Sequence, residues 1–223
     1  MLSERDYMQE VRTRPRWPVT IGILILNVLV FIIQYGAERY FPAYPFDDRF
    51  ALSLGGLKSG YFWQLLTYQF MHASFWHIFF NCWAIYVFGR EVELSFGKAR
   101  MVTLYLTSGV AGGLLQILGS WLLPQHFGDV PVVGASAGAF GLVTAYAVLF
   151  PYRQLIMLLF FVVPIKMRAR TLLWVSVAIA AAGIIVPFGN IAHAAHLGGI
   201  LSGYIFSRVT TQRSGSPGAS GFY

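Results

Sequence analysis

Two histidines, an asparagine and a serine stand in otherwise apolar stretches of the sequence, where polar groups are costly in a membrane. His77 and Asn81 are four residues apart, so a helix would place both on one face. Ser136 lies in a run of glycines and alanines, and His196 follows a second small-residue run. Each of the four has an ordinary interpretation as a helix-packing or interfacial residue, but together they indicate one chemistry.

That chemistry is nucleophilic attack by a serine that a histidine activates. A neutral imidazole, with an ordinary pKa of about 6.5, can take the serine proton at physiological pH and return it to a leaving amine. We therefore expect Ser136 as the nucleophile and His196 as the general base. The backbone amide of Ser136 at a helix N-terminus can stabilise the tetrahedral oxyanion together with the side chains of His77 and Asn81.

An acidic third member is not expected beside Ser136 and His196. No Asp or Glu follows Asp129 in the sequence. Asp129 itself lies in a loop seven residues before Ser136, where we interpret it as a solvated charge. We therefore predict a Ser-His dyad that uses no cofactor and no metal. Other classes of intramembrane protease are disfavoured, because the sequence has neither a His-Glu-x-x-His zinc signature nor a pair of intramembrane aspartates.

The elements that position these residues must lie in lipid. Charged residues make up 11% of the chain, against about 25% in soluble domains, and hydrophobic residues make up 57%. The net charge of +7 is spread over short clusters between apolar runs rather than one basic face, which argues against nucleic acid as a partner. The single cysteine, Cys82, excludes an intrachain disulfide.

Six apolar segments are expected to cross the bilayer as helices, which predicts an all-α membrane protein. The first follows a cluster of arginines and lacks the small-residue cleavage site of a signal peptide, so we interpret it as a retained span. The starts of the second, fourth and sixth spans then lie on the same side of the membrane, which brings the four polar residues to one depth. The expected spans are 17–35, 74–89, 101–123, 135–150, 171–186 and 194–208.

The distribution of lysine and arginine gives the direction of these spans. With the N-terminus in the cytoplasm, 13 of the 16 basic residues fall on the inner side and only Arg39, Arg49 and Lys58 fall outside. We expect an integral multi-pass protein of the plasma (inner) membrane. The apolar stretch 155–165 has 11 residues and is too short to span, so we predict an interfacial or re-entrant segment on the cytoplasmic side.

One membrane domain is expected, at residues 17–209. It follows a cytoplasmic N-terminal segment at 1–16 and precedes a flexible, low-complexity tail at 210–223. The long loop 36–73 is rich in aromatic residues, which we expect to pack partly into the outer leaflet.

Small residues predict a close approach between the fourth and sixth spans. Residues spaced by four give the sixth span one smooth face, and glycines of the fourth span are expected to do the same. Such contact would let a serine hydroxyl reach a histidine ring on the neighbouring helix. The residues are Ala195, Gly199 and Gly203 in the sixth span and Gly134, Gly138 and Gly141 in the fourth.

In three motifs the sequence resembles the rhomboid intramembrane serine proteases, over about residues 17–208. The motifs are His77-x-x-x-Asn81, Gly134-x-Ser136 and Ala195-His196-x-x-Gly199-x-x-x-Gly203, in the family's order and spacing. The resemblance implies that Ser136 is the nucleophile and His196 the base. It implies that His77 and Asn81, supported by Gly134, help hold the oxyanion, and that Phe140 packs beneath the catalytic histidine. It also implies a six-helix bundle with a membrane-embedded first loop, which cleaves transmembrane protein substrates.

Three positions complicate this resemblance. The residue after the serine is commonly glycine in the family, and here it is Ala137. The first loop has Trp63-Gln64 where many members have Trp-Arg, so any structural role of that arginine is absent. His193, three residues before His196, is expected to face roughly the same way and could be mistaken for the base.

Two other functions compete with proteolysis. A catalytically inactive rhomboid-like protein would bind membrane segments for quality control, although the retention of both Ser136 and His196 argues against it. A transporter or channel is disfavoured because the spans lack the charged groups needed for ion coupling and the polar cluster lies on one side only.

Overall fold

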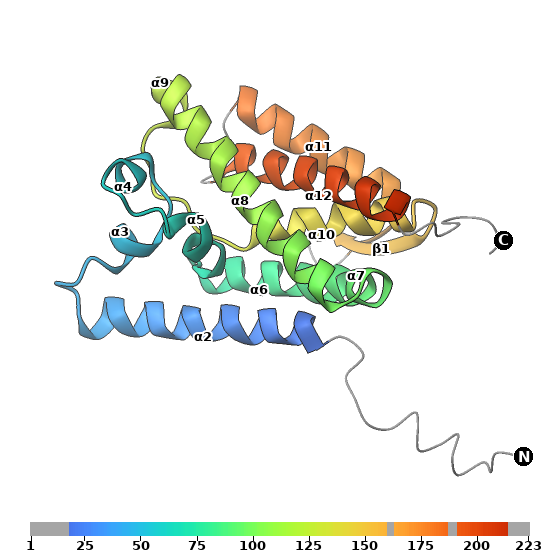
Figure 1. The fold of residues 1–223 in the computed structure, drawn as a ribbon, viewed down its shortest axis with the longest axis horizontal. Coiled ribbons are helices and arrows are strands. Elements are labelled where there is room, and N and C mark those ends of the chain that lie inside the picture. Colours follow the sequence, from blue (N-terminus) through green and yellow to red (C-terminus); the bar gives the residue numbers. More distant parts are fainter. Residues whose placement is uncertain (1–17, 160–162, 187–190, 214–223) are drawn as a thin grey trace, which may run out of the picture.

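The computed structural model describes residues 18–159, 163–186 and 191–213, and most of them are helical (Figure 1). The longer helices are α2 (Pro18–Tyr40), α6 (Phe75–Ala84), α7 (Arg90–Phe96), α8 (Lys98–Leu122), α10 (Ser136–Leu149), α11 (Ala169–Ile185) and α12 (His193–Arg213). Short helices occur in the loops: α3 (Phe46–Phe50), α4 (Leu54–Lys58), α5 (Gln64–Thr67), η1 (Tyr68–Phe70) and α9 (Pro124–Phe127). A π-helical turn, η2 (Ile85–Gly89), joins α6 to α7 without a break.

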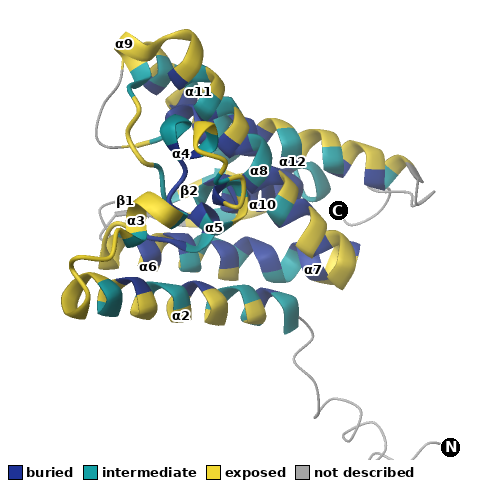
Figure 2. Cartoon of the chain, turned by 60° about the vertical axis from the view of Figure 1, so that its left-hand side comes forward, coloured by how far each residue is buried: buried dark blue, intermediate teal, exposed yellow. Residues whose placement is uncertain are grey.

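Helix α10 packs against both α8 and α12, which also pack directly against each other, and it is buried along most of its length (Figure 2). Glycine contacts explain the close packing of α12 on it. A Cβ atom at Gly199 would collide with the carbonyl oxygen of Ala137, and one at Gly203 would lie 2.7 Å from the carbonyl oxygen of Gly141. The expected small-residue contact therefore exists at Gly199 and Gly203, whereas Gly138 faces the ring of Tyr105 on α8.

The six expected spans correspond to long helical segments, but some of their ends differ. The second was expected to end at residue 89 and instead continues through η2 and α7 to Phe96. The sixth continues to Arg213, so the expected tail boundary at 210 falls inside α12. The segments 1–16 and 214–223 lie outside the described residues. Among the described helices, α2 and α8 are long and apolar enough to cross a membrane by themselves, and α10 and α11 are shorter apolar helices.

An antiparallel hairpin follows α10 in a structure that is otherwise mostly helical. Strand β1 (Gln154–Leu159) pairs with β2 (Val163–Arg168), with Gln154 opposite Arg168. Lys166 and Arg168 alternate with apolar residues, which is the period of two typical of a strand, but the segment was interpreted as one apolar block. Each strand has six residues, and a membrane-crossing strand needs about 9–11, so neither strand spans a bilayer.

The loop between α2 and α6 is folded onto the bundle, and its aromatic residues divide into two groups. Phe62 and Trp63 are exposed, whereas Tyr68 is buried and its hydroxyl donates a hydrogen bond to the carbonyl oxygen of Gly109 at 2.6 Å. The buried Gln64 side chain accepts from the Ser53 amide at 3.2 Å and donates to the Asp48 carbonyl oxygen at 2.8 Å. This glutamine therefore organises the loop at the position where many members of the family have an arginine.

Glu93 of α7 fixes the start of α2. Its buried carboxylate accepts hydrogen bonds from the backbone amides of Val19 and Thr20, at 3.0 and 2.7 Å, and from the Thr20 hydroxyl at 2.8 Å. A carboxylate at a helix N-terminus satisfies amides that lack an intrahelical acceptor and interacts favourably with the helix dipole. This contact was not predicted, because the second span was expected to end before Glu93.

We expect Glu93→Gln to lower the thermal unfolding midpoint of the detergent-solubilised protein more than Glu91→Gln does. Weakening a buried, charged acceptor costs about 2 kcal/mol. The Glu91 carboxylate instead accepts from exposed Arg153 at 2.7 Å, an ion pair that contributes at most about 1 kcal/mol. The measurement is the unfolding midpoint of both variants in the same detergent. Equal midpoints would argue against Glu93 as the cap of α2.

Candidate active site

Ser136 and His196 meet where α10 and α12 begin. Ser136 is the first residue of α10, and His196 lies in the first turn of α12. The Oγ atom of Ser136 and the Nε2 atom of His196 are 2.9 Å apart. At this distance a neutral imidazole can accept the hydroxyl proton, which is the geometry that a serine nucleophile requires.

Phe140 lies one helical turn after Ser136 and packs on the imidazole of His196. The centroids of the two rings are 4.5 Å apart, with an interplanar angle of 43°. An aromatic side chain at this distance restricts the orientation of the imidazole. The structure thus places Phe140 where the family resemblance implies it.

His77 and Asn81, both on α6, flank the backbone at Gly134. The Nδ1 atom of His77 accepts a long hydrogen bond from the Ala73 amide at 3.4 Å, which assigns the ring proton to Nε2. A Cβ atom at Gly134 would lie 2.7 Å from His77 Nε2 and 3.6 Å from Asn81 Nδ2, so both donors point to this position. Gly134 has a φ of +133°, a conformation that favours glycine.

The side-chain amide of Asn81 is a buried donor. Within the described part of the chain, no acceptor lies in hydrogen-bond reach of its Nδ2 atom. An unsatisfied buried donor normally costs stability. Close to Ser136, whose own amide belongs to the first turn of α10, such a donor is suited to stabilise a developing oxyanion.

The first loop holds the segment that leads into Ser136. Leu52 and Val132 exchange backbone hydrogen bonds of 2.9 and 2.8 Å, and the Gly134 amide donates to the Tyr68 carbonyl oxygen at 2.9 Å. The sequence analysis did not identify Leu52 or Tyr68 as site-positioning residues. These contacts involve backbone atoms, so residue type carries no signal for them, and Tyr68 was grouped with the membrane-facing aromatic residues.

Asp129 and His193 are the two other residues that the sequence analysis considered for the site. Asp129 is exposed in its loop, as expected, and its carboxylate accepts from the amides of Leu54 and Gly55 at 2.8 and 2.9 Å at the start of α4. His193 is buried with its ring against Gly183 of α11, and its ring centroid lies 6.2 Å from that of His196. In the part of the chain that the structure describes, no group of three or more His, Cys, Asp or Glu residues is placed to hold a metal ion.

Comparison with known proteins identifies relatives over most of the chain. Rhomboid protein 1 from mitochondria of Saccharomyces cerevisiae is 32% identical over 157 residues, which cover 67% of this chain and 44% of the yeast protein. The putative rhomboid protease YdcA of Bacillus subtilis is 30% identical over 160 residues, 71% of this chain and 72% of that protein. The rhomboid protease GlpG of Photorhabdus laumondii is 29% identical over 201 residues, 87% of this chain and 62% of that protein.

The chain therefore spans less than two thirds of the length of the yeast and Photorhabdus relatives. The family model of the rhomboid domain matches residues 59–213, which include every candidate site residue described above. With this match and the relatives at 30% identity or more, the chain belongs to the rhomboid family of membrane-integral proteins.

Proposed function

We propose that this chain is an intramembrane serine endopeptidase that cleaves transmembrane segments of membrane proteins with a Ser136–His196 dyad. The observation that carries the proposal is the 2.9 Å separation between Ser136 Oγ and His196 Nε2. The names of two relatives, YdcA and GlpG, describe rhomboid proteases, and family membership supports the same activity here.

In the proposed reaction, Ser136 Oγ attacks the carbonyl carbon of the scissile peptide bond while His196 Nε2 takes the hydroxyl proton. The oxyanion of the tetrahedral intermediate receives hydrogen bonds from the Ser136 amide, His77 Nε2 and Asn81 Nδ2. His196 then gives its proton to the leaving amine, and an ester on Ser136 remains. A water molecule, deprotonated by His196, attacks this ester, and His196 returns the proton to Ser136 Oγ as the bond to the serine breaks and the acid product is released.

We propose six spans, formed by α2, the continuous α6–η2–α7 segment, α8, α10, α11 and α12. The N-terminus would lie in the cytoplasm and the protein in the plasma (inner) membrane, because 13 of the 16 basic residues then fall on the inner side. The site would lie below the outer interface. Exposed Phe62, Trp63 and Phe75 support a first loop that is partly embedded in the outer leaflet.

A catalytically inactive rhomboid-like protein that binds membrane segments is the alternative. Binding of a membrane segment does not use a hydroxyl in hydrogen-bond contact with an imidazole, nor a buried amide donor that lacks an acceptor. Both features are present within the described residues at Ser136, His196 and Asn81, and they favour the enzyme.

We expect Ser136→Ala and His196→Ala each to abolish cleavage of a model transmembrane substrate, because each removes one partner of the proton transfer. His193→Ala is the matched control. It removes an imidazole three residues from His196 that packs on Gly183, so it should lower stability but leave most of the turnover per folded molecule. The measurement is product formation in reconstituted vesicles, normalised to folded protein. Full activity of Ser136→Ala would end the proposed mechanism.

A fluorophosphonate probe is expected to label the detergent-solubilised protein at Ser136, because only an activated serine attacks such a probe readily. Mass spectrometry of the labelled peptide gives the position, and His196→Ala should prevent labelling. Cleavage of a substrate by a protein that the probe does not label would indicate a different nucleophile.

Asn81→Ala is expected to lower kcat by about 10²-fold with little change in KM, because its amide acts on the oxyanion rather than on the bound substrate. The control is Asn27→Ala, which removes the same group from another buried position, where the amide donates to the Ile23 carbonyl oxygen within α2. Asn27→Ala should change stability and leave kcat unchanged. Equal kcat values for wild type and Asn81→Ala would exclude Asn81 from the oxyanion site.

A further inference from the structure

A concave basic site, which we call the hairpin hollow, lies between the β-hairpin and the start of α11. It has a volume of about 450 Å³ and is lined by Gln154, Lys166, Met167, Arg168, Arg170 and Thr171. Ser136 is the first residue of α10 and the hairpin follows the last, so the hollow is at the opposite end of that helix from Ser136. Figure 1 shows β1 at the end of the bundle where α7 lies. Its volume is in the range of small-molecule sites, and half of its lining residues carry a positive charge.

The hairpin presents a polar face to this hollow. Pairing places Gln154 opposite Arg168 and Ile156 opposite Lys166, so these four residues lie on one face of the hairpin. All four are exposed. The other face turns towards the bundle, and its described residues are half-buried: Leu155, Ile165 and Met167, of which Met167 also borders the hollow.

The cations of the hollow lack carboxylate partners among the described residues. No carboxylate there lies within ion-pair distance of Lys166, Arg168 or Arg170, and no Asp or Glu follows Asp129 in the sequence. On the neighbouring helix α7, Glu91 accepts from Arg153 and Glu93 is bound to the start of α2. A cluster of cations without local anions favours an anionic ligand from outside the protein.

Exposed aromatic residues indicate that this end of the bundle lies at a membrane interface. Trp174 follows Arg170 by four residues on the same face of α11 and is 69% exposed, and Tyr152 is 66% exposed. Tryptophan and tyrosine are enriched at the level of lipid headgroups. With a rise of about 1.5 Å per residue, Arg170 lies roughly 6 Å from Trp174 along the helix, on the side of the headgroups and water.

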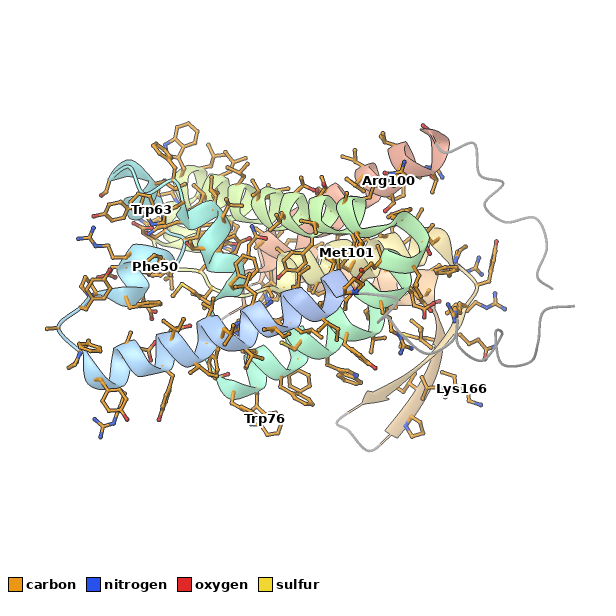
Figure 3. All side chains as sticks on the ribbon, turned by 60° about the horizontal axis from the view of Figure 1, so that its bottom comes forward. Phe50, Trp63, Trp76, Arg100, Met101 and Lys166 are labelled. Atoms are coloured by element: carbon orange, nitrogen blue, oxygen red, sulfur yellow. The ribbon has the colours of Figure 1, made fainter. Side chains whose placement is uncertain are left out.

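We propose that the hairpin hollow binds the phosphate of an anionic phospholipid headgroup, with the hairpin lying along the membrane surface. Figure 3 shows the hairpin extending sideways from the end of the bundle, with Lys166 on it. In this position Lys166, Arg168 and Arg170 reach the lipid phosphate, while exposed Ile156 contacts the apolar part of the interface. Basic residues close to an anionic leaflet bind it electrostatically.

Native mass spectrometry of the full chain in detergent, with added phosphatidylglycerol or phosphatidylcholine, tests this proposal. We expect the wild type to retain phosphatidylglycerol in preference to phosphatidylcholine. The double variant Lys166→Gln/Arg168→Gln should bind phosphatidylglycerol roughly 25-fold more weakly, because each cation near an anionic surface contributes about fivefold in affinity. Circular dichroism and size exclusion check that the variant is folded.

The matched control is Lys98→Gln/Arg208→Gln. It removes the same charge from the same end of the bundle, at the start of α8 and near the end of α12, without touching the hollow. This control should bind phosphatidylglycerol like the wild type. Equal retention of the two lipids, or equal losses in the two double variants, would overturn the proposal in favour of nonspecific attraction.

Two further arms separate other occupants from the lipid. Inorganic phosphate at millimolar concentration and constant ionic strength should leave the bound phosphatidylglycerol in place, and displacement would reassign the hollow to a soluble phosphate compound.

The N-terminal segment contains three acidic residues that could compete with the lipid for the cations of the hollow. The variant Glu4→Gln/Asp6→Asn/Glu10→Gln, which removes them, should bind the lipid like the wild type. A large increase in its lipid binding would show that the N-terminal segment fills the hollow instead, which would overturn the proposal.

Discussion

Backbone contact between α10 and α12 is the constraint on which the candidate site depends. Gly199 lies against Ala137 and Gly203 against Gly141, so the two helices approach more closely than side chains with a Cβ atom would allow. Only at this separation does Ser136 Oγ come within 2.9 Å of His196 Nε2. Small residues let helices pack in lipid, where the hydrophobic effect offers little driving force between them. The same contact therefore stabilises the bundle and sets the geometry for the proposed proton transfer.

The oxyanion groups depend on a second set of contacts, between the first loop and the segment before Ser136. The Leu52–Val132 bridge and the bond from the Gly134 amide to Tyr68 hold that segment against the first loop, and Gly134 then lies beside His77 and Asn81 of α6. The side chain of Gln64 bonds to the backbone of Ser53 and Asp48 within the loop, and the carboxylate of Asp129 accepts from the Leu54 amide. Asn81 can then keep a buried donor without an acceptor among the described residues, a cost that folding tolerates when the donor serves a reaction.

The two ends of the bundle differ in chemistry as well as in sequence. At the end that contains Ser136, the candidate site itself is built from hydroxyl, imidazole and amide groups, whereas the charged residues of that end lie in the loops and in the last turn of α2. The other end carries Arg153 paired with Glu91 and a hairpin whose exposed face is basic. Lysine and arginine residues on the cytoplasmic side orient a membrane protein, and the same residues can contact the lipid headgroups of that leaflet.

By itself the sequence determined the membrane class, the approximate helices and the identity of the polar residues, because hydropathy, small-residue spacing and residue chemistry are local properties. It placed Ser136, His196, His77 and Asn81 at one end of the bundle, which the structure also does. Tertiary structure alone decided that His193 packs on Gly183, that Glu93 caps α2, that Tyr68 is buried and that residues 154–168 form a hairpin. Each depends on backbone bonds or packing between segments distant in sequence, which residue type and local periodicity do not encode.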